Sequence, residues 1–343
     1  MRPNAQKLKF RFMIQLLSTV LVFLSLGLNL NVYAGQIKIG LLLDDLREER
    51  WQKDRDYFVA TGMEAGAKVY VKSANADSSK QIAQVENMIL RSVDVIVVIP
   101  TDGSVLSAVL TKAKSLGIKI ISYDRLVTGT AIDLYVSFDN HIVGRMQAES
   151  LLRIKPKGRY QLIGGSPSDN NALMFREGQM QVLQPAIDRG DIEIVGDEWA
   201  EGWSNENAKI IMRESLKRNA NRIDAVVASN DGCAGAAIEV LESKGLAGKV
   251  AVSGQDAELA AIRRIVRGKQ LMTVYKPIRK LASEAALLAI KLVHGEFIAT
   301  DKTINNGYAE IPAMYLEPVL ITKSNVDSTV VAEGFHGRGE IYQ

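Results

Sequence analysis

Residues 93–125 have the sequence VDVIVVIPTDGSVLSAVLTKAKSLGIKIISYDR, and this stretch decides the fold class. Val93–Pro100 is almost wholly apolar and rich in β-branched residues, which is typical of a strand buried on both faces of a parallel sheet. Ser104–Leu116 has helical spacing, Gly117 ends the predicted helix, and Ile118–Tyr123 is a second buried strand. The stretch therefore predicts a β–α–β unit.

The same alternation extends along most of the chain. The other predicted strands are Ile37–Leu43, Lys68–Ser73, Tyr160–Ile163, Ile192–Val195, Ala225–Ala228, Val250–Ser253 and Leu271–Tyr275. The other predicted helices are Glu48–Ala65, Gln81–Leu90, His141–Ile154, Asn171–Arg189, Asn205–Lys217, Gly235–Lys244, Glu258–Val266 and Ile278–Val293. Regular alternation predicts parallel sheets with helices on both faces, and these elements are too many for one sheet. We therefore expect an α/β protein with two doubly wound parallel-sheet lobes.

Composition narrows the function. With 343 residues, 47% of them hydrophobic, the chain has enough apolar material for a large core and two domains. A single cysteine, Cys233, excludes an intramolecular disulfide, and the three histidines are too far apart in sequence to suggest a metal site. Removing the four Lys and Arg residues of 1–34 leaves 38 basic against 39 acidic residues, so no nucleic-acid partner is expected.

The N-terminal segment has the three-part pattern of a secretory signal. Arg2, Lys7, Lys9 and Arg11 give a cationic start, an apolar stretch follows over Phe12–Leu30, and Val32-Tyr33-Ala34 offers small residues for cleavage after Ala34. A membrane anchor is the alternative, although polar residues dilute the apolar stretch. No cysteine lies near the predicted cleavage site, which excludes a lipoprotein anchor. We expect an exported protein, located in the periplasm of a Gram-negative bacterium.

Polar and aromatic residues gather where the predicted strands end, at the edge where ligands of parallel sheets bind. They are Asp44-Asp45, Arg50-Trp51, Asp102, Asp124-Arg125, Asp139-Asn140, Ser166–Asn171, Trp199, Trp203, Asn230-Asp231, Gln255-Asp256 and Lys276. Carboxylates, amides and cations suit the hydroxyl and ring oxygens of a sugar, and indole rings suit its C–H faces. The pattern predicts a cleft that binds a monosaccharide between the two lobes.

Each of these residues also has a purely structural interpretation. Asp102, and either Asp77 or Ser78, are placed to cap the helices that follow them. Asp44 and Asp45 are adjacent, so at most one should face a ligand. Trp199 could lie either in the core or in the site.

Motifs for catalysis are weak. No GxGxxG follows a strand, no GxxxxGK[ST] is present, and Gly164-Gly165-Ser166 is not the GxSxG turn of a hydrolase. Cys233 lies at the start of a predicted helix, which can lower a thiol pKa, but no partner base is evident and a buried, unreactive thiol is the expectation. We expect neither an enzyme nor a cofactor.

Several blocks of sequence resemble bacterial D-xylose-binding periplasmic proteins. The longest is DDLREERWQKDRD at residues 44–56. The others are Tyr123-Asp124-Arg125, Ser137-Phe138-Asp139-Asn140, Gly165–Asn171, Ala228-Ser229-Asn230-Asp231, Ser253-Gly254-Gln255-Asp256 and Val274-Tyr275-Lys276-Pro277. The resemblance covers residues 36 to 338 and departs at Asp231-Gly232-Cys233-Ala234, where Ala-Thr is expected after the Asn-Asp pair.

This resemblance implies a type I periplasmic binding protein fold with a multi-segment hinge. The N-terminal lobe would comprise 36–139 plus about 277–305, and the C-terminal lobe 140–276 plus about 306–343. The sugar ligands it implies are Arg50, Asp124, Arg125, Asn171, Asn230, Asp256 and Lys276, with Trp51 and Trp203 on the two faces of the ring. The membrane permease of an ABC importer would be the partner.

Rival interpretations remain open at this point. Ribose, glucose, galactose or a signalling furanone could replace D-xylose, and a chemoreceptor could replace or join the permease. A transcription regulator can share the two-lobed fold, but it needs a DNA-binding head that this sequence lacks. A secreted glycosidase is the enzymatic rival, because paired carboxylates are also the machinery of glycoside hydrolysis.

Overall fold

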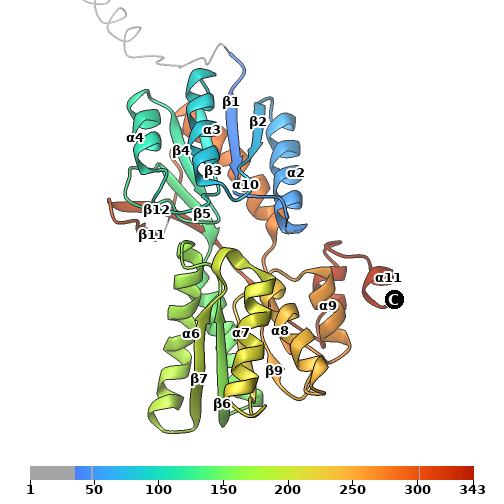
Figure 1. Cartoon of the computed structure of the whole chain (residues 1–343). Helices are drawn as coiled ribbons and strands as arrows, with labels where there is room; N and C mark the ends of the chain where they lie inside the picture. Colours follow the sequence, from blue (N-terminus) through green and yellow to red (C-terminus); the bar gives the residue numbers. More distant parts are fainter. Residues whose placement is uncertain (1–34, 48, 301) are drawn as a thin grey trace, which may run out of the picture. The chain divides into compact units, whose positions relative to one another are not determined.

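The computed structural model describes residues 35–47, 49–300 and 302–343 of the chain. The expected export signal at 1–34 lies outside the described residues. Ile37–Gln343 form one unit, built around two main sheets with separate cores (Figure 1).

The first main sheet has seven strands in the order β11-β12-β5-β4-β3-β1-β2. Its strands are β1 (Lys38–Leu43), β2 (Lys68–Ser73), β3 (Val95–Val98), β4 (Lys119–Tyr123), β5 (Leu134–Phe138), β11 (Lys302–Asn305) and β12 (Glu310–Leu316). All neighbours pair in parallel except β11 and β12. The fully buried four-residue run of β3 confirms the central strand that the sequence predicted.

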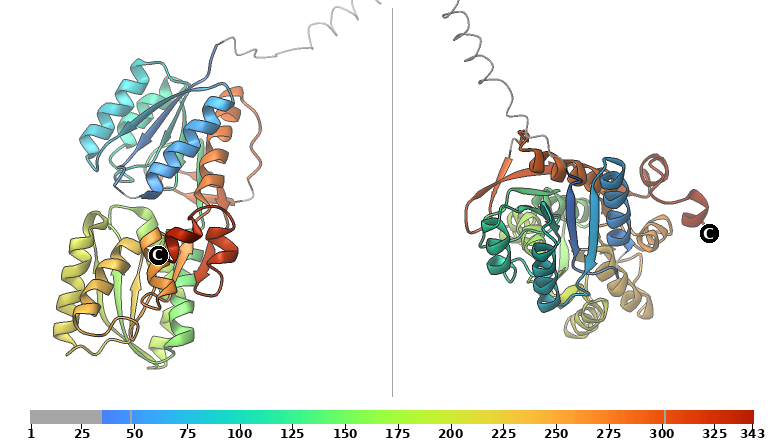
Figure 2. Two further views of the ribbon diagram at one scale, coloured as in Figure 1. Left: turned by 90° about the vertical axis from the view of Figure 1, so that its right-hand side faces the viewer. Right: turned by 90° about the horizontal axis from the view of Figure 1, so that it is seen from above.

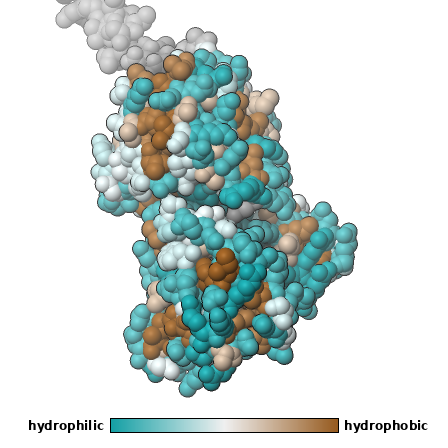
Figure 3. Space-filling view, in the orientation of Figure 1, coloured by the Kyte–Doolittle hydropathy of each residue, from teal (hydrophilic) through white to brown (hydrophobic). Residues whose placement is uncertain are grey.

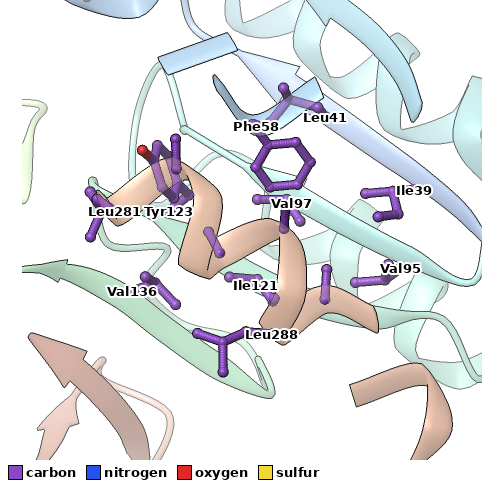
Figure 4. Packing of buried hydrophobic residues seen from close by; sticks show 14 of the residues in the cluster. Ile39, Leu41, Phe58, Val95, Val97, Ile121, Tyr123, Val136, Leu281 and Leu288 are labelled. Atoms are coloured by element: carbon purple, nitrogen blue, oxygen red, sulfur yellow. The ribbon is translucent and has the colours of Figure 1, made fainter. Parts of the chain in front are cut away.

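Helices cover both faces of this sheet. On one face α2 (Glu49–Glu64) and α10 (Ile278–His294) pack on the strands, and Figure 4 shows Phe58 and Leu281 in this layer. On the other face lie α3 (Ser78–Leu90) and α4 (Ser107–Ser115). Because both faces are covered, an inner strand such as β3 is apolar throughout, whereas the edge strands β2 and β11 carry exposed polar residues.

The second main sheet is wholly parallel, in the order β7-β6-β8-β9. Its strands are β6 (Gly158–Gly164), β7 (Ile192–Trp199), β8 (Ala225–Ala228) and β9 (Ala251–Val252). One face carries α5 (Asn140–Ile154) and α6 (Asn170–Asp188), and the other carries α7 (Asn205–Arg218) and α8 (Asp231–Ser243). The two-lobed α/β fold class is therefore confirmed.

A smaller group of elements flanks the second sheet. Strand β10 (Met272–Tyr275) pairs antiparallel with β13 (Val319–Thr322), and α9 (Leu259–Val266) packs on them with the π-helix Asp327–Val331 and α11 (Arg338–Ile341). Figure 2 shows the last part of this group, the segment after β13, in red. Together with the second sheet it forms the second lobe, and the first sheet with its helices forms the first lobe.

The chain passes between the two lobes three times, after β5, between β10 and α10, and between β12 and β13. Placing 306–343 wholly in the second lobe was wrong, because β12 pairs in parallel with β5 and buries Ile311 and Ala313 in the first lobe. The first lobe therefore extends to Leu316 rather than to about 305.

Some element bounds also differ from the prediction. Helix α8 begins at Asp231 rather than Gly235, because the Asn230 side chain caps it by accepting the Cys233 N–H at 2.9 Å. Asp77 caps α3 as expected. Asp102 instead caps a turn over Ser104 and Val105, since α4 itself starts only at Ser107.

Among the residues that the structure describes, large exposed apolar side chains occur on several different elements. Examples are Met63 on α2, Leu90 on α3 and Ile154 on α5. Figure 3 shows apolar residues distributed among hydrophilic ones on the face it presents. Within the described ranges, no helix has both the length and the apolar character needed to cross a bilayer. No group of three or more His, Cys, Asp or Glu in the described chain is arranged to hold a metal.

Candidate sugar-binding site

A small cavity lies at the carboxyl ends of the strands and is lined from both lobes. All nine residues predicted as sugar contacts line it: Arg50, Trp51, Asp124, Arg125, Asn171, Trp203, Asn230, Asp256 and Lys276. Three further residues complete the lining, Asp169, Phe175 and Gln255.

Arg50 is the central cation of the cavity. Helix α2 starts directly after β1 and carries Arg50 in its first turn, where its guanidinium is buried. Its Nη2 lies 2.8 Å from Asp124 Oδ2 and its Nη1 lies 3.2 Å from Asp256 Oδ1. Behind it, Nε lies 3.4 Å from Asp54 Oδ2, and the Tyr123 hydroxyl donates to the other oxygen of Asp54. Arg50 thus joins carboxylates of both lobes.

Arg125 makes a second link between the lobes. Its Nε lies 2.8 Å from Asp169 Oδ2, and its Nη1 lies 2.6 Å from Asp44 Oδ2. Asp169 also caps α6 and accepts the Trp203 indole N–H at 3.1 Å. Asp45 instead pairs with Arg47, so of the two adjacent acids only Asp44 reaches an arginine of the cavity, and neither acid lines the cavity itself.

The charges lining the cavity balance. Among the residues that the structure describes, the lining has the cations Arg50, Arg125 and Lys276 and the carboxylates Asp124, Asp169 and Asp256. The sequence analysis named only Asp124 and Asp256 as charge partners and missed Asp169, although it lies inside the Ser166–Asn171 strand-end run. Because buried unpaired charge is costly, this balance favours an uncharged ligand.

Burial and neighbouring positive charges shift the pKa values of the carboxyl groups at the cavity in opposite directions. Burial alone would raise the pKa of Asp124, but the charges of Arg50 and Lys276 outweigh it and lower that pKa to about 2. At Asp54 burial dominates over Arg50 and raises the pKa to about 6. Burial also raises the pKa of Asp169 from its ordinary value, against the charge of Arg125. Asp124 is therefore the most firmly ionised of these acids.

Amide and ammonium groups supply the remaining polar lining. Asn171 donates through Nδ2 to the Asp124 carbonyl and carboxylate at 3.0 and 3.1 Å. Asn230 uses its Oδ1 to cap α8, which leaves its Nδ2 as a donor for the cavity. Lys276 Nζ lies 3.9 Å from Asp124 Oδ2 and 5.3 Å from the centre of the Phe175 ring.

Three aromatic rings line the cavity. Trp51 stacks on the Arg50 guanidinium at 4.0 Å, and Trp203 meets Phe175 edge to face at 6.4 Å. A Cβ at Gly165 would lie 2.1 Å from the Trp203 ring, so this glycine gives the indole its space. Phe175 lies inside α6, where helical spacing alone gives no reason to select it from the sequence.

Other residues that the sequence analysis considered for the site have structural roles instead. The Trp199 ring packs beside the Arg176 guanidinium at 4.8 Å and does not line the cavity. Cys233 is buried at the start of α8. Asp231, in the segment that departs from the resemblance, accepts hydrogen bonds from Gln270, Thr273 and the Glu258 backbone. It therefore anchors neighbouring elements and stays outside the cavity lining.

Comparisons with known proteins identify the family of this chain and agree with its fold. The sequence profile described as periplasmic binding protein domain matches residues 39–297. The chain belongs to the periplasmic binding protein family. Among members of this family, the D-xylose-binding periplasmic protein of Haemophilus influenzae is 54% identical over 91% of this chain and 94% of its own length. The D-xylose-binding periplasmic protein of Escherichia coli is 53% identical over 91% of this chain and 95% of its own length.

Solved periplasmic binding proteins share the architecture. A carbohydrate transporter solute-binding protein from Chloroflexus aurantiacus, in complex with D-glucose, superposes with a TM-score of 0.85 at 30% identity. The superposition covers 89% of this chain and 98% of that protein. The expected family and fold are therefore confirmed.

Proposed function

We propose that this periplasmic binding protein captures D-xylose between its two lobes and delivers it to the permease of an ABC sugar importer. The observation that carries the proposal is a cavity lined by three buried cations and three buried carboxylates, whose charges cancel, and by two tryptophans. The identity of 53–54% to two D-xylose-binding periplasmic proteins supports the choice of sugar. The protein is a binding protein and not an enzyme.

In this proposal the nine predicted residues contact different chemical groups of the sugar. Asp124 and Asp256 accept hydrogen bonds from hydroxyl groups, while Arg50, Arg125, Lys276 and the two asparagines donate to hydroxyl and ring oxygens. Trp51 and Trp203 cover the C–H faces of the ring. A phosphorylated or acidic ligand would require an excess of cations that the lining lacks.

The binding energy available is sufficient for tight capture. A pentose has ten non-hydrogen atoms, so the upper limit of roughly 1.5 kcal/mol per atom gives about 15 kcal/mol. Micromolar affinity needs only about 8 kcal/mol. Ordering the two lobes can therefore consume several kcal/mol without preventing binding.

We further propose that residues 1–34 are an export signal cleaved after Ala34, so that the protein works in the periplasm. The cationic start, the apolar stretch and the small residues at the predicted cut support this. We propose contact with a chemoreceptor as a second role, supported by the 32% identity to the multiple sugar-binding periplasmic receptor ChvE of Rhizobium radiobacter.

Titration calorimetry with D-xylose, D-glucose and D-ribose tests the choice of sugar. We expect D-xylose to bind at micromolar concentration or tighter and D-glucose much more weakly. Asp256→Ala should lose at least about 2 kcal/mol of this affinity, because it leaves Arg50 and a sugar hydroxyl without a partner. Equal affinity for xylose and glucose would contradict the pentose assignment. Turnover of a xyloside would support the glycosidase instead.

A further inference from the structure

The C-terminal segment, residues 323–343, contacts the neighbours of three cavity residues while lining none of the cavity itself. It packs on α9, β10 and β13 through Val326, Val330 and Ile341. Figures 1 and 2 show this segment beside α9. Its contacts toward the site come from Glu333, Phe335 and His336.

The first contact joins this segment to the helix that carries Arg50. Lys53, one turn after Arg50 on α2, donates from Nζ to the Phe335 carbonyl at 3.1 Å. The same ammonium lies 4.1 Å from the centre of the Phe335 ring. Through these two interactions the Lys53 ammonium of the first lobe contacts one residue of the second lobe, Phe335.

The second contact fixes the turn that follows Asp256. His336 is buried, and its Nε2 lies 2.7 Å from the Ala257 carbonyl. Because a carbonyl only accepts, Nε2 must carry the hydrogen. Asp256 and Ala257 both have left-handed backbone, with φ of 95° and 51°. Such a turn is unfavourable for residues other than glycine unless its surroundings hold it.

The third contact lies beside Lys276. The Tyr275 hydroxyl donates to Glu333 at 2.9 Å, and the Tyr275 ring lies 4.9 Å from that of Phe335. The segment thus reaches the neighbours of Arg50, Asp256 and Lys276, which supply three of the six balancing charges.

We propose that Phe335 and His336 form a latch that holds the Asp256 turn in its binding conformation and ties α2 to the second lobe. Lys53, Phe335 and His336 are positioning residues in this proposal, since none contacts the cavity. The proposal rests on the proposed sugar-binding function. Losing the latch should leave the cavity lining intact but make the bound arrangement open sooner, which shortens the life of the complex.

Paired variants test the latch. Lys53→Met removes the donor and keeps the length, whereas Lys53→Arg restores a donor and the charge. Lys209→Met is the matched control. The Lys209 side chain is 26% exposed, against 25% for Lys53, and it pairs with Glu239 as Lys53 pairs with Glu49. His336→Leu and His336→Gln form a second pair, since the Gln amide can replace the ring N–H.

We expect Lys53→Met to bind D-xylose about three- to tenfold more weakly, the range for losing one partly exposed charged hydrogen bond. Stopped-flow tryptophan fluorescence should place this change in the dissociation rate, with association and melting temperature close to wild type. Lys53→Arg, His336→Gln and Lys209→Met should retain tight binding, and His336→Leu should not. Wild-type affinity in Lys53→Met, or a loss that Lys53→Arg does not restore, would overturn the latch.

A second measurement keeps the latch separate from the choice of sugar. If the wild-type protein binds no sugar of the panel, the proposed function fails, and hydrogen exchange of the α2 amides then decides the latch. Faster exchange in Lys53→Met than in wild type and Lys209→Met supports it. Equal exchange in all three proteins contradicts it. If His336→Leu fails to fold, the Lys53 variants decide alone.

Discussion

Asp124 and Asp256 occupy matching positions in the two lobes. Each follows a strand of its sheet, each has left-handed backbone with φ of 59° and 95°, and each donates its N–H at 2.8 Å to a valine carbonyl of the next strand. Aspartate tolerates this conformation better than most residues. The turn points both carboxylates at Arg50, so backbone geometry and charge pairing specify the same arrangement.

Asp54 should make the free energy of unfolding depend on pH. Its carboxyl has a pKa of about 6 in the folded protein, above its ordinary value of 3.8, so the folded state binds more protons between these pH values. The free energy of unfolding should therefore fall as the pH rises from about 4 to about 6. Asp54→Asn cannot titrate and should lose this contribution, at most about 3 kcal/mol.

Urea denaturation of both proteins at intervals from about pH 4 to about pH 7 measures this difference. The wild type should lose more stability across the interval than Asp54→Asn. Parallel curves for the two proteins would show that Asp54 is not the titrating group.

Helices α5 and α6 pack with their backbones in contact, which sets the position of Phe175 in the cavity. A Cβ at Gly144 would lie 2.1 Å from the Phe175 carbonyl oxygen, and a Cβ at Gly178 would lie 2.2 Å from the His141 carbonyl oxygen. Neither carbonyl can withdraw without moving its helix. The two glycines are therefore required for this helix pair.

We expect Gly178→Ala to lower the free energy of unfolding by about 1–3 kcal/mol, because the helices must separate. This is opposite in sign to the gain of about 1 kcal/mol that alanine normally brings to a helix interior. Gly339→Ala on α11 is the control, since its Cβ would meet no atom within 4 Å. Thermal or urea denaturation compares the two, and an unchanged or raised stability of Gly178→Ala would contradict the close packing.

Whether a strand could be predicted from the sequence depends on how it is covered and connected in the fold. Strands such as β3 and β8 are buried on both faces, so their apolar runs identify them. Strand β5 was not predicted because it follows β4 through a loop with no helix, which interrupts the alternation. The β11–β12 hairpin was missed as well, since it joins the first sheet only after the chain has returned from the second lobe.

The site was more predictable than the details around it. Strand-end position selects polar residues such as Asp124 and Asn230, because the carboxyl ends of parallel strands face one cavity. Asp54 lies four residues after Arg50 on α2, so helical spacing brings the two together, whereas only tertiary packing brings Phe175 of α6 to Trp203. The Gly144–Gly178 contact likewise depends on how two helices cross, which sequence spacing does not specify.

At the scale of the whole molecule, the three chain crossings and the cavity belong to one arrangement. Of the charged side chains that line the cavity, the first lobe supplies Arg50, Arg125 and Asp124, and the second supplies Asp169, Asp256 and Lys276, which directly follows β10. Within this lining the first lobe alone has one cation in excess and the second lobe alone has one carboxylate in excess. Together they cancel, which links the approach of the lobes to the formation of a site for a neutral sugar.

A crystal structure grown with D-xylose tests this claim most directly. We expect one pentose in the cavity, with Trp51 and Trp203 on its two faces and its hydroxyl groups within hydrogen-bond distance of Asp124 and Asp256. The ion pairs from Arg50 and Arg125 across the two lobes should persist around it. A sugar bound elsewhere, or a cavity ligand that carries charge, would contradict the account.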